Sequence, residues 1–207
     1  MGFQTASGVV LNRRIAGEGD LLLTLFLKGA GMTFASARGA ASGKVRFGGG
    51  TEPLTWGTFA LYKTSGGGRH LKSVDIADDM LNLRTRSSAL FAAVRWARLL
   101  MRHLMTDHPA DDLLANLYWN MKLLNEAALP VEAAEWRFLW RWLKSWGLAP
   151  GLPDFMECSE PELELLHGVA TTKSSVLREW TAKGILTPHA QLFATALRRA
   201  EGYLREI

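Results

Sequence analysis

The 207-residue sequence contains a single cysteine, Cys158. One cysteine cannot form an intramolecular disulfide, and such low cysteine usage fits a reducing compartment. The apolar runs are much shorter than the ~20 residues that a membrane-spanning helix needs. The first residues also lack the basic stretch followed by an apolar stretch that marks a secretory signal. We therefore expect a cytoplasmic protein that does not engage a membrane.

The usual patterns of catalytic and metal sites are also missing. The segment 39–44 does not have the spacing of a phosphate-binding loop, and Val45 stands where such a loop needs Ser or Thr. His103 and His108 do not share one helical face, and the sequence has no Cys-x-x-Cys pair and no GxSxG nucleophile elbow. We expect no metal, no cofactor and no enzymatic activity.

Positive charge is concentrated in the N-terminal part of the sequence. Residues 1–74 hold nine Lys and Arg against three Asp and Glu, whereas residues 75–207 hold fifteen against seventeen. The first part therefore has a net charge of +6 and the second a net charge of −2. A basic segment of this kind favours a polyanionic partner, with nucleic acid as the first candidate. The alternative is ordinary solvated surface charge.

Glycine and tryptophan divide the sequence in two. Fifteen of the twenty glycines precede residue 75, and seven of the eight tryptophans follow it. This change predicts an all-β domain over residues 1–78 and a helical domain over residues 79–207. Five short β segments are expected, at residues 7–14, 20–28, 32–38, 56–63 and 69–76. We therefore expect an α+β fold, with an N-terminal five-stranded OB-fold β-barrel followed by an α-helical domain.

In the second part, the spacing of apolar residues is helical. It predicts helices over residues 81–105, 111–128 and 130–146. Ser174-Ser175 and Thr187-Pro188 indicate two further helix starts, and residues 150–161 are expected to form a loop.

Basic and aromatic residues are interleaved in the β part. Phosphates attract cations and unpaired bases stack on flat rings, so a barrel that presents both can bind a nucleic-acid strand. In the glycine-rich loop 38–50 (RGAASGKVRFGGG), Phe47 either stacks on bases or anchors the loop. Phe59 and Tyr62 either stack on bases or fill the core. The candidate DNA contacts are Arg13, Arg14, Arg38, Lys44, Arg46, Phe47, Lys63, Arg69 and Lys72.

The helical segment 136–146 (WRFLWRWLKSW) has a basic stripe. Arg137, Arg141 and Lys144 recur at helical spacing, and Trp140 flanks them. One interpretation is a core helix with a solvated charged face. The other is a basic-aromatic groove, in which Arg137, Trp140, Arg141 and Lys144 bind an acidic partner tail with an apolar tip, or nucleic acid.

Several motifs in the N-terminal half match a known family in order and spacing. The sequence has a GxVL first strand, Gly17-Glu18-Gly19-Asp20 before an apolar strand, a basic loop ending in Arg46-Phe47-Gly48-Gly49, and a strand ending in Leu61-Tyr62. In this pattern the chain resembles the RecO family of bacterial recombination mediators. The likeness is clear over about the first 100 residues and looser through residue 154.

The resemblance implies a non-enzymatic, DNA-binding recombination mediator in DNA repair. Such a protein binds single- and double-stranded DNA, anneals complementary strands and assists loading of the recombinase RecA. Its implied partners are RecR and the acidic C-terminal tail of the single-stranded-DNA-binding protein, and its implied location is the cytoplasm, at the nucleoid during repair. DNA contact is carried over to Arg38, Lys44 and Arg46. The rival hypothesis is a protein-interaction adaptor whose basic-aromatic helix binds a partner, with little direct DNA binding.

The sequence departs from the family pattern in two places. Many members carry a four-cysteine zinc site in the helical domain, whereas here only Cys158 follows the matching segment 147–154. We therefore expect the zinc module to be lost around residues 154–168. Ala40 and Ala41 replace basic residues of the family loop, so DNA affinity is expected to be weaker or to depend more on a partner.

Overall fold

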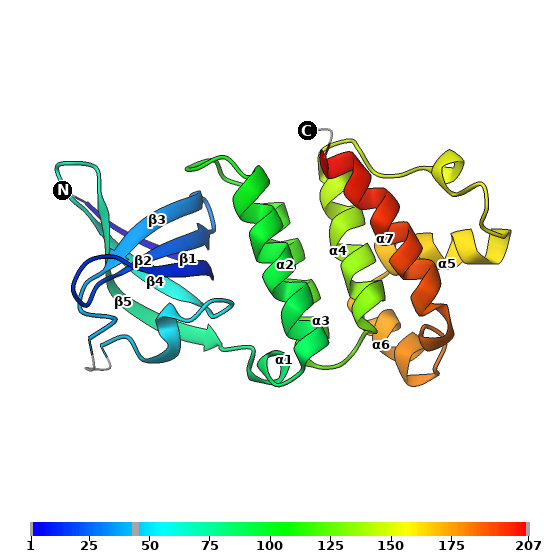
Figure 1. Ribbon diagram of the computed structural model, residues 1–207, viewed down its shortest axis with the longest axis horizontal. Coiled ribbons are helices and arrows are strands. Elements are labelled where there is room, and N and C mark those ends of the chain that lie inside the picture. The colour runs from blue at the N-terminus through cyan, green and yellow to red at the C-terminus, as the bar shows by residue number, and fades with distance from the viewer. Residues whose placement is uncertain (1, 43–45, 206–207) are drawn as a thin grey trace. The chain divides into compact units, whose positions relative to one another are not determined.

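The computed structural model describes residues 2–42 and 46–205 (Figure 1). The fold is mixed α+β, with a five-stranded sheet followed by a helical region. Two compact units can be separated, one made of residues 1–81 and 93–114 and the other of residues 82–92 and 115–207. The domain boundary between residues 78 and 79 stays a prediction.

The sheet closes into a barrel in the order β1-β2-β3-β5-β4. β1 pairs antiparallel with both β2 and β4, and β3 meets β5 in parallel at Ser36 and His70. The strands are β1 (Gly2–Ile15), β2 (Leu21–Leu27), β3 (Gly31–Ala37), β4 (Trp56–Lys63) and β5 (Arg69–Asp78). All five expected strands are present. β1 begins earlier than predicted because residues 2–7 form a ladder with β4.

The barrel core is aliphatic and comes mainly from β2. This strand is nearly continuously buried, and only Leu22 in it is half-buried. Phe59 is fully buried within the same core, so it is a packing residue and not a stacking platform. The core cluster consists of Val10, Leu21, Leu23, Leu25, Leu27, Ala35, Ala37, Phe59, Leu61 and Leu71.

The chain after helix α2 (Ser87–His103) returns to the barrel at the start of β3. The backbone N–H of Asp107 donates to the carbonyl of Met32 at 2.8 Å. Gly29 donates its N–H to Oδ1 of Asp111 at 2.7 Å. Gly31 lies directly against this segment, with φ at +72°, and a Cβ atom there would be 1.9 Å from the carbonyl oxygen of His108. Only glycine fits this position without moving backbone.

The helices are α1 (Leu81–Arg84), α2 (Ser87–His103), α3 (Asp111–Asn125), α4 (Val131–Ser145), α5 (Glu160–Thr171), α6 (Ser174–Ala182) and α7 (Ala190–Arg205). The single helix expected over 81–105 is interrupted at Thr85, whose hydroxyl donates to the carbonyl of Asn82. α5 is an addition to the predicted set. Its start is stabilised by Glu162, whose carboxylate accepts the Ser159 N–H at 2.8 Å.

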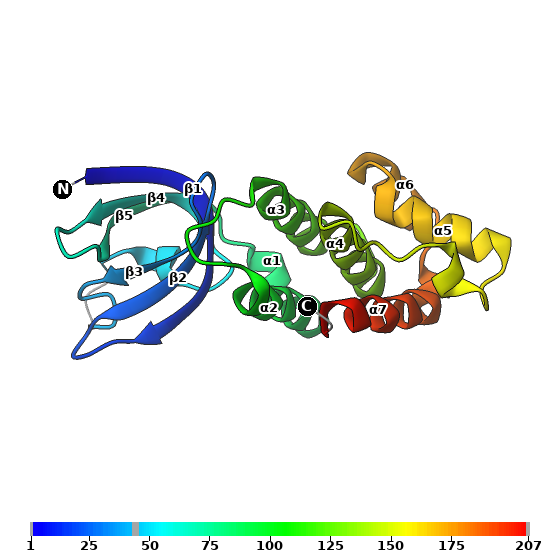
Figure 2. The same ribbon diagram turned by 90° about the horizontal axis from the view of Figure 1, so that it is seen from above.

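α4 is the central helix of the second unit, and it packs against α5 and α7 (Figures 1 and 2). Trp136, Phe138 and Trp142 of α4 are buried almost completely. The indole N–H of Trp136 donates to the carbonyl of Leu166 in α5 at 2.8 Å. Burial of these large rings stabilises this unit, because each ring removes a large apolar area from water.

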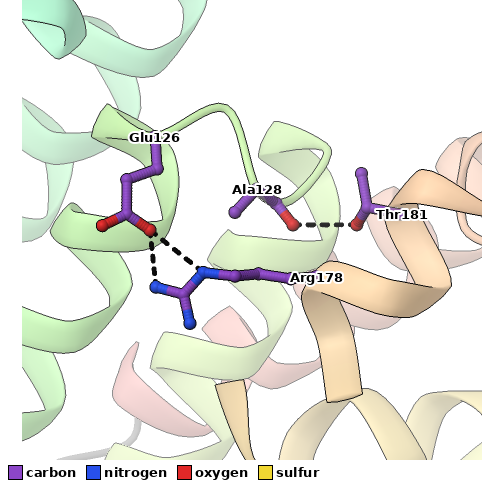
Figure 3. Close-up of polar contacts among 4 residues, drawn as sticks. All are labelled: Glu126, Ala128, Arg178 and Thr181. Carbon is purple, nitrogen blue, oxygen red and sulfur yellow. Dashed lines mark hydrogen bonds and ion pairs between the residues drawn. The ribbon is translucent and has the colours of Figure 1, made fainter. Parts of the chain in front are cut away.

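α6 is joined to the turn between α3 and α4 by polar contacts (Figure 3). The guanidinium of Arg178 donates to Oε2 of Glu126 through two nitrogens, at 3.1 and 2.5 Å, and the hydroxyl of Thr181 donates to the carbonyl of Ala128 at 2.8 Å. The ion pair is solvent-exposed, so it contributes at most about 1 kcal/mol. These contacts orient α6 more than they stabilise it.

The segment where the family resemblance places a zinc module is joined to α7 by side-chain contacts. Arg199 donates to the carboxylate of Glu157 at 2.7 Å and to the carbonyl of Asp154, and the Tyr203 hydroxyl contacts the Asp154 carboxylate. Burial, with the nearby negative Glu162, raises the pKa of the Cys158 thiol. Within residues 2–42 and 46–205, no group of three or more His, Cys, Asp or Glu could hold a metal ion.

Candidate nucleic-acid interface

The end of β1 and the loop after β3 form a basic hollow on the barrel. Its volume is about 300 Å³, and it is lined by Arg13, Arg14, Ile15, Leu21, Ala40 and Ala41. Arg14 is exposed, while Arg13 forms an ion pair with Glu52 at 2.6 Å. The structure thus brings together two candidate arginines and the loop that were far apart in sequence.

The loop is positioned by the turn between β1 and β2. The N–H of Gly39 donates to Oδ1 of Asp20 at 2.7 Å, and the N–H of Ala41 donates to the carbonyl of Gly19 at 2.9 Å. Gly17 and Gly19 both have positive φ in this turn. The Gly-Glu-Gly-Asp motif therefore has a structural role: its glycines form the turn and its aspartate holds the basic loop.

Arg38 and Arg46 both belong to the described residues of this loop, 38–42 and 46–50, and both are exposed. The Arg46 guanidinium donates to the carbonyl of Arg38 at 2.7 Å and lies 5.0 Å from the centre of the Phe47 ring. Phe47 is half-buried and packs against the barrel core. Of its two expected roles, this packing favours anchoring of the loop. Lys44 lies outside the described residues.

A second group of basic residues lies where β4 ends and β5 begins. Lys63 and Arg69 face each other across the β4–β5 pair, and Lys72 follows on β5. Lys63 and Lys72 are exposed, whereas Arg69 is half-buried and forms an ion pair with Asp107 at 3.0 Å. The positive charge of Arg69 is thus largely balanced within the chain.

Phe3 is a surface aromatic that the sequence analysis does not identify. It is 68% exposed, its ring centre is 5.5 Å from that of Tyr62, and the Lys72 ammonium lies 4.6 Å from the ring centre. The available signal in the sequence was an aromatic residue, Phe3, shortly before the expected first strand. It was missed because β1 was expected to begin at residue 7.

The two arginines of the basic stripe of α4 form hydrogen bonds within the chain, so the partner-binding site expected on this stripe has to be corrected. Arg137 is 1% exposed, and its guanidinium donates to the carbonyls of Val169 at 2.6 Å and Ala170 at 3.3 Å. Arg141 donates to the carbonyl of Ala170 at 2.7 Å. The two arginines satisfy the free carbonyls at the end of α5, where the helix dipole is negative. The prediction that Arg137 contacts a partner is therefore wrong.

The buried guanidinium of Arg137 remains a cation. Burial, and next the positive charge of Arg141, lower the pKa of Arg137 to about 9. This value is above neutral pH, so the side chain keeps its proton and its charge-assisted hydrogen bonds. Burial also lowers the pKa of Arg141.

Trp140 and Lys144 are beside a separate apolar cavity of about 340 Å³. Trp140 lines this cavity together with Trp136, Phe155 and His167, and the ammonium of Lys144 lies 5.1 Å from the centre of the Trp140 ring. Trp140 is mostly buried, and Lys144 is exposed. Of the four expected partner-binding residues, Trp140 lines an apolar cavity and Lys144 provides an exposed cation next to Trp140.

None of the helices in the described part of the chain is both long and apolar enough to span a membrane. The fold is that of an α+β protein with an N-terminal β-barrel. Residues 1–80 match the family described as "Recombination protein O N terminal". The chain belongs to the RecO family.

Several relatives extend the likeness beyond the barrel. "DNA repair protein RecO" of Anaeromyxobacter dehalogenans (strain 2CP-C) is 33% identical over 156 residues, which cover 75% of this chain and 61% of that protein. The protein of the same name from Heliobacterium modesticaldum is 30% identical over 158 residues, with 75% and 56% covered. The one from Desulfatibacillum aliphaticivorans is 24% identical over 189 residues, with 90% and 67% covered. The chain spans about three fifths of the length of the first two relatives.

Proposed function

We propose that this chain is a DNA-binding recombination mediator in DNA repair, and that its barrel is an OB-fold. The observation that carries the proposal is the basic hollow, where Arg13 and Arg14 lie beside the loop that contains Arg38 and Arg46. Cations around a shallow hollow can track a phosphate backbone without reading its sequence. The names of the relatives agree with a role in DNA repair.

Strand annealing and the binding of both single and double strands would follow from contacts that do not depend on the DNA sequence. A protein that screens the charge of two strands, while leaving their bases free, would anneal complementary DNA and bind single and double strands alike. We propose that the chain acts in the cytoplasm and without enzymatic chemistry. Its partners would be RecR and the acidic tail of the single-stranded-DNA-binding protein, with the recombinase RecA assisted indirectly.

The proposal is tested by fluorescence anisotropy of labelled single-stranded DNA over a series of salt concentrations. Changing Arg14, Arg38 and Arg46 together to glutamine should weaken binding by at least about tenfold. It should also reduce the steepness of the log–log salt dependence by up to about 2, because each lost phosphate contact to a single strand contributes roughly 0.7.

A matched control removes the same charge from the helical unit, by changing the exposed residues Lys173, Arg198 and Arg205 to glutamine. This variant should bind DNA nearly as the parent does. Equal losses in both variants would show that only net charge matters and would overturn the role of the hollow. Absence of DNA binding by the parent at low salt would overturn the mediator proposal itself.

The adaptor is the second candidate function, and the cavity beside Trp140 and Lys144 favours it. An acidic peptide with an apolar end could place that end in the cavity and its carboxylates near Lys144. Lys144→Glu should weaken binding of such a labelled peptide by about three- to tenfold, because a charge at the rim would then repel it. Lys173→Glu, an exposed lysine away from the cavity lining, is the control. Equal peptide affinity of the two variants would remove the cavity as the site.

A further inference from the structure

The outer face of the β1–β4–β5 ladder presents an aromatic pair and small side chains. Phe3 lies directly opposite Tyr62 in the β1–β4 ladder, and Tyr62 lies opposite His70 in the β4–β5 ladder. Directly opposite residues share one face of a sheet. Next on the same face come Thr5, Ala60 and Ser73, which are small and partly or fully exposed. Small side chains therefore border the Phe3–Tyr62 pair and leave the surface beside the two rings open.

The Phe3 ring is not used for packing in the barrel. Phe26 and Phe59 of the barrel are fully buried and Phe34 is 44% exposed, whereas Phe3 is 68% exposed in spite of its contacts with Tyr62 and Lys72. Single exposed apolar residues are common and need no explanation. An exposed ring with a second ring on one side and an ammonium within 4.6 Å is a more specific arrangement.

Lys72 is placed over Phe3 by an irregularity in the sheet. The pairing of β4 with β5 shifts between Ala60 and Leu61, so Leu71 and Ser73 have partners on β4 and Lys72 is the extra residue between them. A bulge of this kind redirects a side chain.

We propose that Phe3 and Tyr62 form a stacking platform for an unpaired nucleobase, with Lys72 contacting the adjacent phosphate. Rings provide a sequence-tolerant surface for bases, and cations beside them meet the backbone. The ligand is a single strand, because bases in a duplex are already stacked and not accessible from the side. This inference rests on the proposed function in so far as the ligand is DNA.

The platform is distinct from the basic hollow. Phe3 is near the start of β1, and Arg13 is near its end. Phe3 pairs with Tyr62 of β4, whereas Arg13 pairs with Leu23 of β2. The two sites give one barrel two positions for a strand, one that stacks bases and one that contacts phosphates. A protein with both positions can hold an unpaired strand while a second one approaches.

The test compares Phe3→Ala with the parent in anisotropy assays on a single strand and on a duplex of the same sequence. Single-strand affinity should fall by about 5- to 100-fold, as expected for loss of one stacked base, with duplex affinity nearly unchanged. The salt dependence should stay the same, since no cation is removed. Phe3→Tyr should restore binding, and Lys72→Gln should reduce the salt dependence.

Phe91→Ala is the matched control, because Phe91 is equally exposed, at 73%, and lies on α2 outside the barrel. Its single-strand affinity should equal that of the parent. Circular dichroism of Phe3→Ala would show whether the barrel is intact. If it is not, Phe3→Leu keeps apolar bulk without a flat ring and should show the same loss of single-strand affinity. Equal affinity of the parent and folded Phe3→Ala would overturn the platform. Failure of the parent to bind any DNA would instead overturn the proposed function.

Discussion

Arg137→Met is expected to lower the free energy of unfolding of the helical region by about 2–4 kcal/mol. The methionine keeps most of the apolar stem, but the carbonyls of Val169 and Ala170 lose their charged donor. Hydrogen bonds to a charged group contribute about 1.5–3 kcal/mol each, and buried carbonyls left without a donor add a desolvation cost. The measurement is urea unfolding followed by tryptophan fluorescence, since Trp136, Trp140 and Trp142 all lie on α4.

Lys144→Met on the same helix is the control. Lys144 is exposed, so its replacement should change the free energy of unfolding by less than about 0.5 kcal/mol. Buried ionic groups can sometimes be replaced by apolar ones without loss of stability. A stability of Arg137→Met equal to or above that of the parent would show that apolar packing, and not the arginine, holds α5 against α4.

Gly31→Ala is expected to destabilise the barrel unit by about 2–4 kcal/mol. The positive φ of residue 31 alone costs about 1–2 kcal/mol for a residue with a side chain. In addition, the new Cβ would lie 1.9 Å from the carbonyl oxygen of His108, so the backbone of the segment after α2 has to move. That movement weakens the hydrogen bond between Asp107 and Met32. Urea unfolding and hydrogen exchange at Asp107 would report both effects.

Gly29→Ala separates backbone strain from steric conflict. Gly29 also has positive φ, at +69°, but a Cβ atom at this position would have no neighbouring atom within 4 Å. This variant should lose only about 1–2 kcal/mol, the cost of the conformation itself. If the two alanine variants were equally stable, the contact between Gly31 and the His108 carbonyl would have no energetic importance.

The strands were predictable because their signals are local. Glycines with positive φ mark the turns, and the apolar segments between them are long enough for one strand each. The extension of β1 to Gly2 was not predictable, because residues 2–7 are mostly exposed and form a strand only through pairing with β4. The pattern of apolar residues also did not predict the break at Thr85 or the helix α5.

The candidate site was predictable only as a set of residue types. Composition and the family motifs pointed to Arg13, Arg14, Arg38 and Arg46, and these surround one region of the barrel. The ion pairs of Arg13 with Glu52 and of Arg69 with Asp107 join residues distant in sequence, so no spacing rule could indicate them. Phe3 was not predicted because the expected first strand began at residue 7, and because its neighbours Tyr62 and Lys72 belong to other strands.

By itself, the sequence determined the order of a basic β region and a helical region, the five strands and the membership of the RecO family. These properties depend on periodicity, turn residues and motifs that lie within short segments. Tertiary structure alone decided which cations face solvent. Arg137 and Lys144 share one stripe of α4, yet Arg137 is buried and Lys144 is exposed. The difference arises because the end of α5, about thirty residues further along the chain, packs over Arg137, and its free carbonyls attract a buried guanidinium.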